Sequence, residues 1–149
     1  MIDTPNPRIR AAAAIVQEGA LLLVRHEKDG RGYWMLPGGG VQWGEGIDAA
    51  VRRELIEETG LEVSTGELLF VKDTIHPEGA RHMVHIVLRA TVVGGELRPS
   101  QDPRVVETRW VPFSDLPAID FRPDVMPVLI QLLAEAERPA PYLANSWVD

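Results

Sequence analysis

Three glutamates, Glu54, Glu57 and Glu58, are crowded into the short stretch RRELIEETG, which covers residues 52–60. At about 100° per residue, a helix would place all three side chains on one arc of about 100°. Like charges at this spacing repel and weaken a helix slightly, so something has to compensate for them. A hard cation such as Mg²⁺ prefers oxygen ligands and is commonly held by one or two carboxylates together with substrate phosphate. The residues alone leave a second interpretation open, in which they form a solvated acidic face.

The segment that carries these glutamates is predicted to be a helix over Ile47 to Thr59. Ile47, Val51 and Leu55 form an apolar stripe with a spacing of four residues, next to the carboxylate arc, and this stripe should face the core. Gly46 is a candidate N-cap, weaker than serine or aspartate. Gly60 is well placed to end the helix in the left-handed conformation.

Upstream of the helix, the pattern predicts strands and turns. IRAAAAIVQEGALLLVRHE is typical of two strands joined by a turn near Glu18 and Gly19. EKDGRGY is predicted to be a polar loop, and WMLPGGG to be a glycine-rich turn that leads toward the helix.

Downstream, we expect strands near Leu68–Lys72 and His82–Val93, and a third at VVETRWV. Apolar residues at helical spacing predict a last helix near 124–137, which tolerates Pro127 only in its first turn. RPAPYLANSWVD is interpreted as a tail. No linker or repeat divides the 149 residues, so a single domain over 1–149 is expected.

Composition narrows the classes of function. The chain has a net charge of −7, and six acidic against two basic residues between positions 45 and 62 account for −4 of it. This balance disfavours generic nucleic-acid binding, which depends on lysine and arginine. No apolar run is long enough to cross a membrane, and the start resembles no signal peptide. Together with the absence of cysteine, these features make the cytoplasm the expected location.

The glutamates also belong to a longer pattern. From Gly39 to Leu61 the chain resembles the Nudix box, G-x5-E-x7-R-E-U-x-E-E-x-G-U with U aliphatic, and every specified position is filled. WMLPGGG before the box and ETRWVPFSDLP after it also resemble segments of that family. The resemblance implies an α/β fold of the Nudix type, an α/β/α sandwich with a mixed sheet.

It also implies an activity. Most members of the family are Mg²⁺- or Mn²⁺-dependent hydrolases of a diphosphate linkage in a small nucleoside-diphosphate derivative. Nucleotide sugars, ADP-ribose, dinucleoside polyphosphates and nucleoside triphosphates are the substrate classes to consider. By this resemblance Glu57 and Glu58 are metal ligands, and the Gly38 carbonyl is a third. Glu54 is either a further ligand or the base that deprotonates the attacking water.

Other box residues would position this machinery. Glu45 and Arg53 are expected to form a salt bridge that orients the carboxylates. The glycines, among them Gly39 as a candidate contact to substrate, let the backbone approach the metal and turn sharply. Gly60 is expected to be structural.

Outside the box, four residues are candidates for the site, and three of them have a second interpretation. Glu107 is either another ligand to metal or water, or a strand carboxylate paired with Arg109. Arg25 is either a phosphate contact or a solvated surface residue. Tyr33 and Trp34 are candidates for stacking on a base, and packing is the alternative for Trp34. His82 and His85, three apart on a strand, should point to opposite faces and share no metal.

Two rivals to a hydrolase come from the same family. One is a Nudix-fold nucleotide-binding or sensor module without catalysis, which would usually have lost box glutamates. The other is an isomerase acting on an isoprenoid diphosphate. The complete box favours hydrolysis of a small-molecule nucleotide substrate, and the oligomeric state, a homodimer included, stays open.

Overall fold

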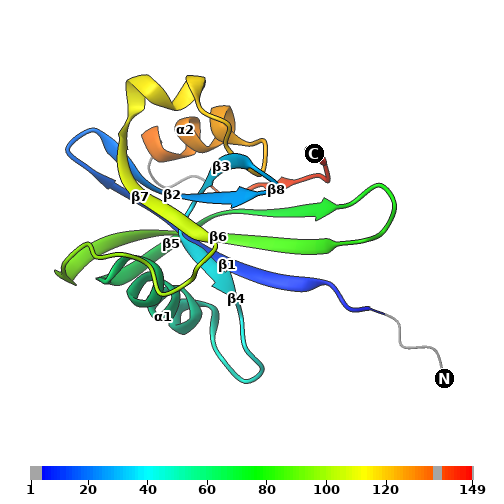
Figure 1. Cartoon of the computed structure of the whole chain (residues 1–149), viewed down its shortest axis with the longest axis horizontal. Helices are drawn as coiled ribbons and strands as arrows, with labels where there is room; N and C mark the ends of the chain where they lie inside the picture. The colour runs from blue at the N-terminus through cyan, green and yellow to red at the C-terminus, as the bar shows by residue number, and fades with distance from the viewer. Residues whose placement is uncertain (1–4, 136–138, 149) are drawn as a thin grey trace.

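The computed structural model describes residues 5–135 and 139–148. In chain order, its elements are β1 (Arg8–Gln17), β2 (Ala20–Lys28), β3 (Arg31–Met35), β4 (Gly38–Gly40), α1 (Ile47–Thr59), β5 (Leu61–Ile75), β6 (His82–Gly95), β7 (Val105–Pro112), the 3₁₀ helix η1 (Phe113–Ala118), α2 (Met126–Ala134) and β8 (Tyr142–Leu143). The strands form one eight-stranded mixed sheet, and α1 and α2 lie on its opposite faces (Figure 1). The predicted α/β/α sandwich is therefore confirmed.

Strand β1 lies in the middle of the sheet, whose order is β3-β2-β1-β6-β5-β8. Along one edge, β1 pairs parallel with β6. Along its other edge, its first residues pair with β4 and its last residues pair with β2. Strand β5 pairs antiparallel with β6 and parallel with β8, while β7 pairs with β2. The short glycine strand β4 is thereby fixed against the centre of the sheet.

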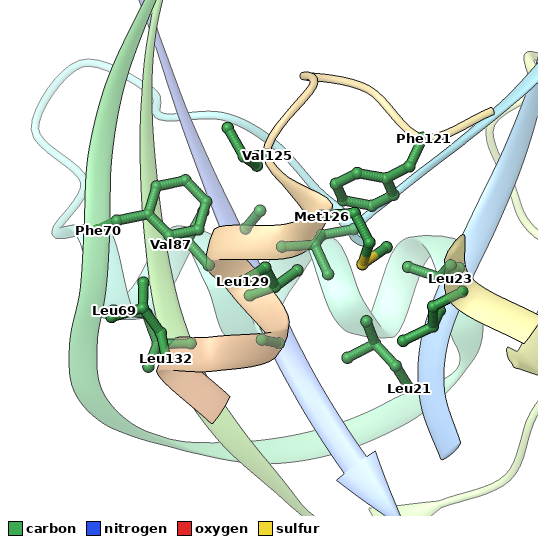
Figure 2. Close-up of a cluster of buried hydrophobic side chains, with 14 of the residues drawn as sticks. Leu21, Leu23, Leu69, Phe70, Val87, Phe121, Val125, Met126, Leu129 and Leu132 are labelled. Atoms are coloured by element: carbon green, nitrogen blue, oxygen red, sulfur yellow. The ribbon is translucent and has the colours of Figure 1, made fainter. Parts of the chain in front are cut away.

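Two hydrophobic cores form because buried strand residues alternate between the faces of the sheet. On β1, Ala11, Ala13 and Ile15 pack toward α1, whereas Ala12 and Ala14 belong to the core under α2. Figure 2 shows the second core, in which residues of α2 meet apolar side chains of β2, β5 and β6. Both helices are therefore held by apolar burial, the main favourable contribution to folding.

Helix α1 has the predicted bounds. Val51 and Leu55 are fully buried as expected, but Ile47 is exposed, so the apolar stripe starts one turn later than predicted. Gly46 is the N-cap, and no side chain provides a capping hydrogen bond. Gly60 ends the helix at φ 81°, and its N–H donates to the Ile56 carbonyl, which confirms the predicted left-handed cap.

Two local predictions were wrong, and one strand is longer than predicted. The segment EKDGRGY is a tight hairpin between β2 and β3, since Asp29 and Gly30 both adopt positive φ; Asp-Gly is a strong hairpin signal. Gly38–Gly40 is a strand, because pairing with β1 satisfies its backbone. The strand expected near Leu68–Lys72 is present, but it is longer and begins directly after Gly60.

The C-terminal part also differs from the prediction. Helix α2 is shorter than 124–137, whose residues 136–137 lie outside the described part of the chain, and Pro127 is in its first turn as required. The expected tail contains a strand, β8, that pairs with β5. Among the described residues, no helix is long and apolar enough to span a membrane.

Candidate active site

The three box glutamates form a graded series around α1. The exposed fraction of the side chain is 46% for Glu57 and 16% for Glu54. Glu58, on the side nearest the buried stripe, is only 2% exposed as a residue. The arc predicted from helical spacing is therefore present, and it runs from solvent into the core.

Arg53 is the centre of an ion-pair network on the exposed side of this arc. Its Nε and Nη2 donate to the two Glu45 oxygens at 2.7 and 2.9 Å. Its Nη1 donates to Glu54 Oε1 at 2.8 Å and to Glu57 Oε2 at 3.4 Å, and Nη2 also donates to the Gly40 carbonyl. The expected pair with Glu45 is present, and hydrogen bonds from Arg53 lower the pKa of Glu45 to about 2. Arg53 thus relieves part of the repulsion for which the sequence analysis offered a bound cation as compensation.

Glu58 has a different environment. Its Oε1 accepts a 2.6 Å hydrogen bond from the Gly38 N–H, and none of the ion pairs among the described residues includes it. Burial raises the pKa of Glu58 to about 7, against the opposing positive charge of Arg10. A buried carboxylate without a cationic partner is costly when ionised, so this position suits a bound cation.

The glycines of β4 make room for the carboxylates. A Cβ on Gly39 would lie 2.3 Å from the Glu54 carboxylate carbon, and one on Gly38 would lie 2.3 Å from the Ala11 carbonyl oxygen. A Cβ on Gly40 would meet nothing within 4 Å. Gly39 is therefore needed for the position of Glu54, and Gly38 for the close contact between β4 and β1.

These donors fit a hard divalent cation. Within residues 5–135 and 139–148, no three acidic or histidine side chains are already gathered as metal ligands. The arc nevertheless offers carboxylate oxygens beside a backbone strand, and Glu58 brings a buried charge that a cation would neutralise. Oxygen donors of this kind are those that Mg²⁺ and Mn²⁺ prefer.

A cleft of about 840 Å³ opens in front of the arc and includes Glu54, Glu57, Glu58 and Gly38–Gly40 in its wall. Seven of the 15 lysines and arginines of this acidic chain also line it: Arg8, Arg10, Lys28, Arg31, Arg81, Arg104 and Arg122. Acidic and basic groups thus share one cavity, an arrangement suited to a metal ion and phosphate oxygens together.

Arg10 was missed by the sequence analysis. It lies on β1 opposite Gly40, and its Nη2 donates to the Leu36 carbonyl at 2.7 Å. Side chains alternate between the two faces of β1, so Arg10 lies on the same face as Ala12 and Ala14, which pack into the core under α2. A cation at a core-facing position of an apolar strand is the signal that would have identified it.

The structure separates the candidates outside the box. Tyr33 lines the cleft, and the Arg122 guanidinium lies over its ring at 4.9 Å. Trp34 packs against the core under α2 instead, with Arg109 over its ring at 5.1 Å. Base stacking therefore remains a role for Tyr33 but not for Trp34.

Arg25 and Glu107 are absent from the cleft lining. They face each other across β2 and β7, and each pairs within its own strand, Arg25 with Glu27 and Glu107 with Arg109. This placement favours the non-catalytic interpretation of both residues.

The two histidines of β6 have separate partners. His85 is buried in the cleft wall, where its Nε2 forms a 2.9 Å hydrogen bond with Thr74 Oγ1. His82 contacts Asp73 at 3.3 Å. Their side chains therefore have different partners on β5.

Comparison with known proteins places this geometry in a family. The NUDIX domain family matches residues 7–133. An ADP-ribose pyrophosphatase from Methanocaldococcus jannaschii is 32% identical over 117 residues, which are 78% of this chain and 68% of the relative. An oxidized purine nucleoside triphosphate hydrolase from Danio rerio is 38% identical over 111 residues, 72% of this chain and 70% of the relative. Several further relatives are longer proteins, of which the chain spans 26% to 44%.

The fold has solved counterparts as well. A NUDIX hydrolase from Nitrosomonas europaea superposes with a TM-score of 0.79 at 22% identity, covering 91% of this chain and 93% of the other. This likeness concerns the fold. With the complete box and the match over residues 7–133, the chain belongs to the Nudix hydrolase family.

Proposed function

We propose that the protein hydrolyses a diphosphate linkage in a small nucleoside-diphosphate derivative, with Mg²⁺ or Mn²⁺ as cofactor. One observation carries the proposal: three carboxylates on one arc of α1 line the same cleft as seven cationic side chains. The carboxylates suit a metal ion, and the cationic side chains suit the phosphates. The metal would neutralise phosphate charge and lower the pKa of the attacking water.

The chain's own residues would then divide the work. Glu57, Glu58 and the Gly38 carbonyl would hold the metal. Arg53 occupies Oε1 of Glu54, so Oε2 is the oxygen left to accept the proton of the attacking water if Glu54 is the base. Gly39 would keep this carboxylate in place.

Recognition of the substrate would use the cationic lining. Arg10 lies near enough to Glu54 and Glu58 for its charge to interact with both carboxylates. This position suits Arg10 to contact a phosphate bound between its guanidinium and the carboxylates. Tyr33 would stack on a ring of the substrate. Because these cations line a single cleft, we expect the cleft to bind a small molecule rather than generic nucleic acid. We also expect the protein to act in the cytoplasm.

Two alternatives are disfavoured by the same residues. A non-catalytic sensor module has no need for a complete acidic arc with a buried glutamate, and the family's isomerases would not require the full hydrolytic box. A homodimer stays a prediction.

A substrate panel with metal control tests the proposal. Phosphate-bond cleavage should be measured for nucleotide sugars, ADP-ribose, dinucleoside polyphosphates and nucleoside triphosphates. At least one class should be turned over, the activity should vanish with EDTA, and excess Mg²⁺ or Mn²⁺ should restore it. Full turnover in metal-free buffer, or no turnover on any class, would refute the proposed function.

A further inference from the structure

The chain between β6 and β7 is bonded to the last turn of α1. The last four carbonyls of a helix have no partner within it, and two of those of α1 accept hydrogen bonds from this connection. The Arg98 N–H donates to the Thr59 carbonyl at 3.0 Å. The Gln101 N–H donates to the Glu57 carbonyl at 3.1 Å. We call residues 96–104 the anchored loop, which passes beside α1 in Figure 1. It is therefore fixed to the helix that carries the box glutamates.

The end of the anchored loop brings a close ion pair, Asp102 with Arg104, to the cleft lining. Arg104 Nε donates to Asp102 Oδ1 at 3.1 Å, and Nη2 donates to Oδ2 at 2.8 Å. Asp102 thereby occupies the edge of the guanidinium formed by Nε and Nη2. The edge formed by Nη1 and Nη2 makes no hydrogen bond to another described residue, and the Arg104 side chain is 74% exposed. One edge holds the group in place, and the other is available to a ligand.

A second guanidinium, that of Arg10, lies in the same part of the cleft. It donates to the Leu36 carbonyl, and no ion pair within residues 5–135 and 139–148 includes it. Burial, with the charge of Arg104 as a further cause, lowers the pKa of Arg10. The two cations therefore lie close enough to repel each other. A phosphate accepts hydrogen bonds from several arginine N–H groups at once, so a phosphate bound to both would relieve this repulsion.

A salt bridge on an exposed loop is by itself weak evidence of a function, because such pairs contribute little to stability. The pair of Glu107 and Arg109 provides the comparison within this chain. It has the same spacing of two residues, and both its members lie outside the cleft lining. Arg104 differs from Arg109 because it lines the cleft together with Arg10 and the carboxylates of α1. This position, more than the ion pair, gives Arg104 a ligand to contact.

We propose that Arg104 is a second phosphate-binding residue, which contacts the same phosphate as Arg10, and that Asp102 is a positioning residue for its guanidinium. This rests on the proposed function, in which carboxylates of α1 hold the metal and the substrate carries a diphosphate. Because the anchored loop is bonded to α1, the phosphate contact and the metal ligands keep a fixed relation to each other. Arg104 acts on the group that all the nucleotide classes share, and the choice among them falls to other residues.

Binding of methylenediphosphonate tests this role without hydrolysis, because water does not cleave its P–C–P bridge. Its affinity should be measured by calorimetry in excess Mg²⁺ for the wild type, Arg104→Gln and the matched control Arg109→Gln. Loss of a hydrogen bond to a charged group weakens binding by about tenfold to hundredfold. Arg104→Gln should lose about that factor, and Arg109→Gln should match the wild type. Arg104→Lys should fall between them, since it keeps the charge and loses the fork.

Asp102→Asn separates positioning from charge. Removal of a negative charge beside a phosphate should by itself strengthen binding, whereas loss of positioning should weaken it. We expect Asp102→Asn to weaken binding of the diphosphonate by about threefold or more, and to cause no such loss when it is combined with Arg104→Gln. An unchanged or tighter affinity of Asp102→Asn would overturn its positioning role.

The binding results also separate the role of Arg104 from the proposed function. No binding of the diphosphonate by the wild type, or equal affinities of Arg104→Gln and Arg109→Gln, would overturn the phosphate contact even if the protein hydrolyses nucleotides. Weaker binding by Arg104→Gln, without cleavage of any nucleotide by the wild type, would support the phosphate contact and refute the proposed hydrolysis. Where nucleotides are cleaved, Arg104→Gln should lower kcat/KM by a similar factor on each class. An effect confined to one class would overturn a contact with the shared phosphate.

Discussion

The two walls of the cleft are held by different kinds of interaction. On the box side, one charged residue, Arg53, connects Glu45, Glu54 and Glu57 within 13 positions of chain. On the other side, residues 142–148, of which the last three line the cleft, are held to β5 by hydrogen bonds between groups 69 to 72 positions apart. The first wall fixes charged groups on a rigid helix, as precise chemistry requires. The second depends on strand pairing and hydrogen bonds between segments that are distant in sequence.

The largest effect on turnover should come from a substitution at Gly39, which lies beside the carboxylate of Glu54. Gly39→Ala introduces a Cβ about where the Glu54 carboxylate lies, with 2.3 Å between them. Glu54 would have to leave its position and its bond to Arg53, so we expect turnover to fall by at least about 100-fold. The folded structure should persist, because the displaced atoms are the far end of a flexible side chain.

Gly40→Ala is the matched control for that experiment. It adds the same methyl group to the next residue, where nothing lies within 4 Å. Its turnover should stay near that of the wild type, while circular dichroism should show both variants folded. Equal turnover in the two variants would show that Glu54 does not need the space beside Gly39.

A smaller effect, on the free energy of unfolding, is expected at Gly60, which ends the helix that carries the three box glutamates. Gly60 has φ 81°, and a Cβ there would lie 2.4 Å from the Glu96 carbonyl oxygen. Gly60→Ala should lower the free energy of unfolding by about 3 kcal/mol or more, measured by urea denaturation. Gly19 has φ 75° and open space around it, so Gly19→Ala should cost only about 1 kcal/mol of backbone strain. A cost at Gly60 no greater than at Gly19 would contradict the close contact with Glu96.

The third effect concerns His85, which lies between the two walls. Burial, with the charge of Arg10 as a second cause, lowers the pKa of His85 to about 4, against about 6.5 in the unfolded chain. Since the folded state favours the neutral ring, this contribution to stability is fully present above pH 6.5 and is lost as the pH falls toward 4. Between pH 7.5 and 5 the loss should be about 2 kcal/mol.

His85→Gln checks this contribution, because it keeps a group able to hydrogen-bond with Thr74 and removes the titration. In chelated buffer, the free energy of unfolding of the variant should fall by about 2 kcal/mol less than that of the wild type over the same pH range. Parallel pH dependence in the two proteins would mean that His85 is not buried as neutral imidazole.

The contrast between the walls also explains which parts could be predicted. The carboxylate arc, the Gly60 cap and the position of Pro127 follow from local spacing and from backbone preferences, and the structure has all three. The turn at Glu18 and Gly19 is present as well, with both residues at positive φ. These features depend on residues near one another in sequence, where helical period and turn chemistry decide the outcome.

What could not be predicted depends on distant partners. Gly38–Gly40 has the composition of a turn and becomes a strand only because β1 is there to pair with it. The C-terminal stretch RPAPYLANSWVD has no strand pattern of its own, and it contains a strand because β5 offers an edge with which it can pair. Arg10 enters the site through a fold that brings β1, β4 and α1 together. Local pattern contains no such information.

The most direct test of the central claim, that the α1 carboxylates hold the metal that hydrolysis needs, compares Glu58→Gln with Glu62→Gln. Glu62 is an exposed acid of the same segment outside the cleft. Turnover, Mn²⁺ affinity and the unfolding free energy of the metal-free protein should be measured for both. Glu58→Gln should lose turnover by orders of magnitude and bind Mn²⁺ more weakly. Its metal-free form should be no less stable than the wild type, since an unpaired buried charge is removed. Glu62→Gln should resemble the wild type throughout, and near-wild-type turnover and Mn²⁺ affinity in Glu58→Gln would contradict the account.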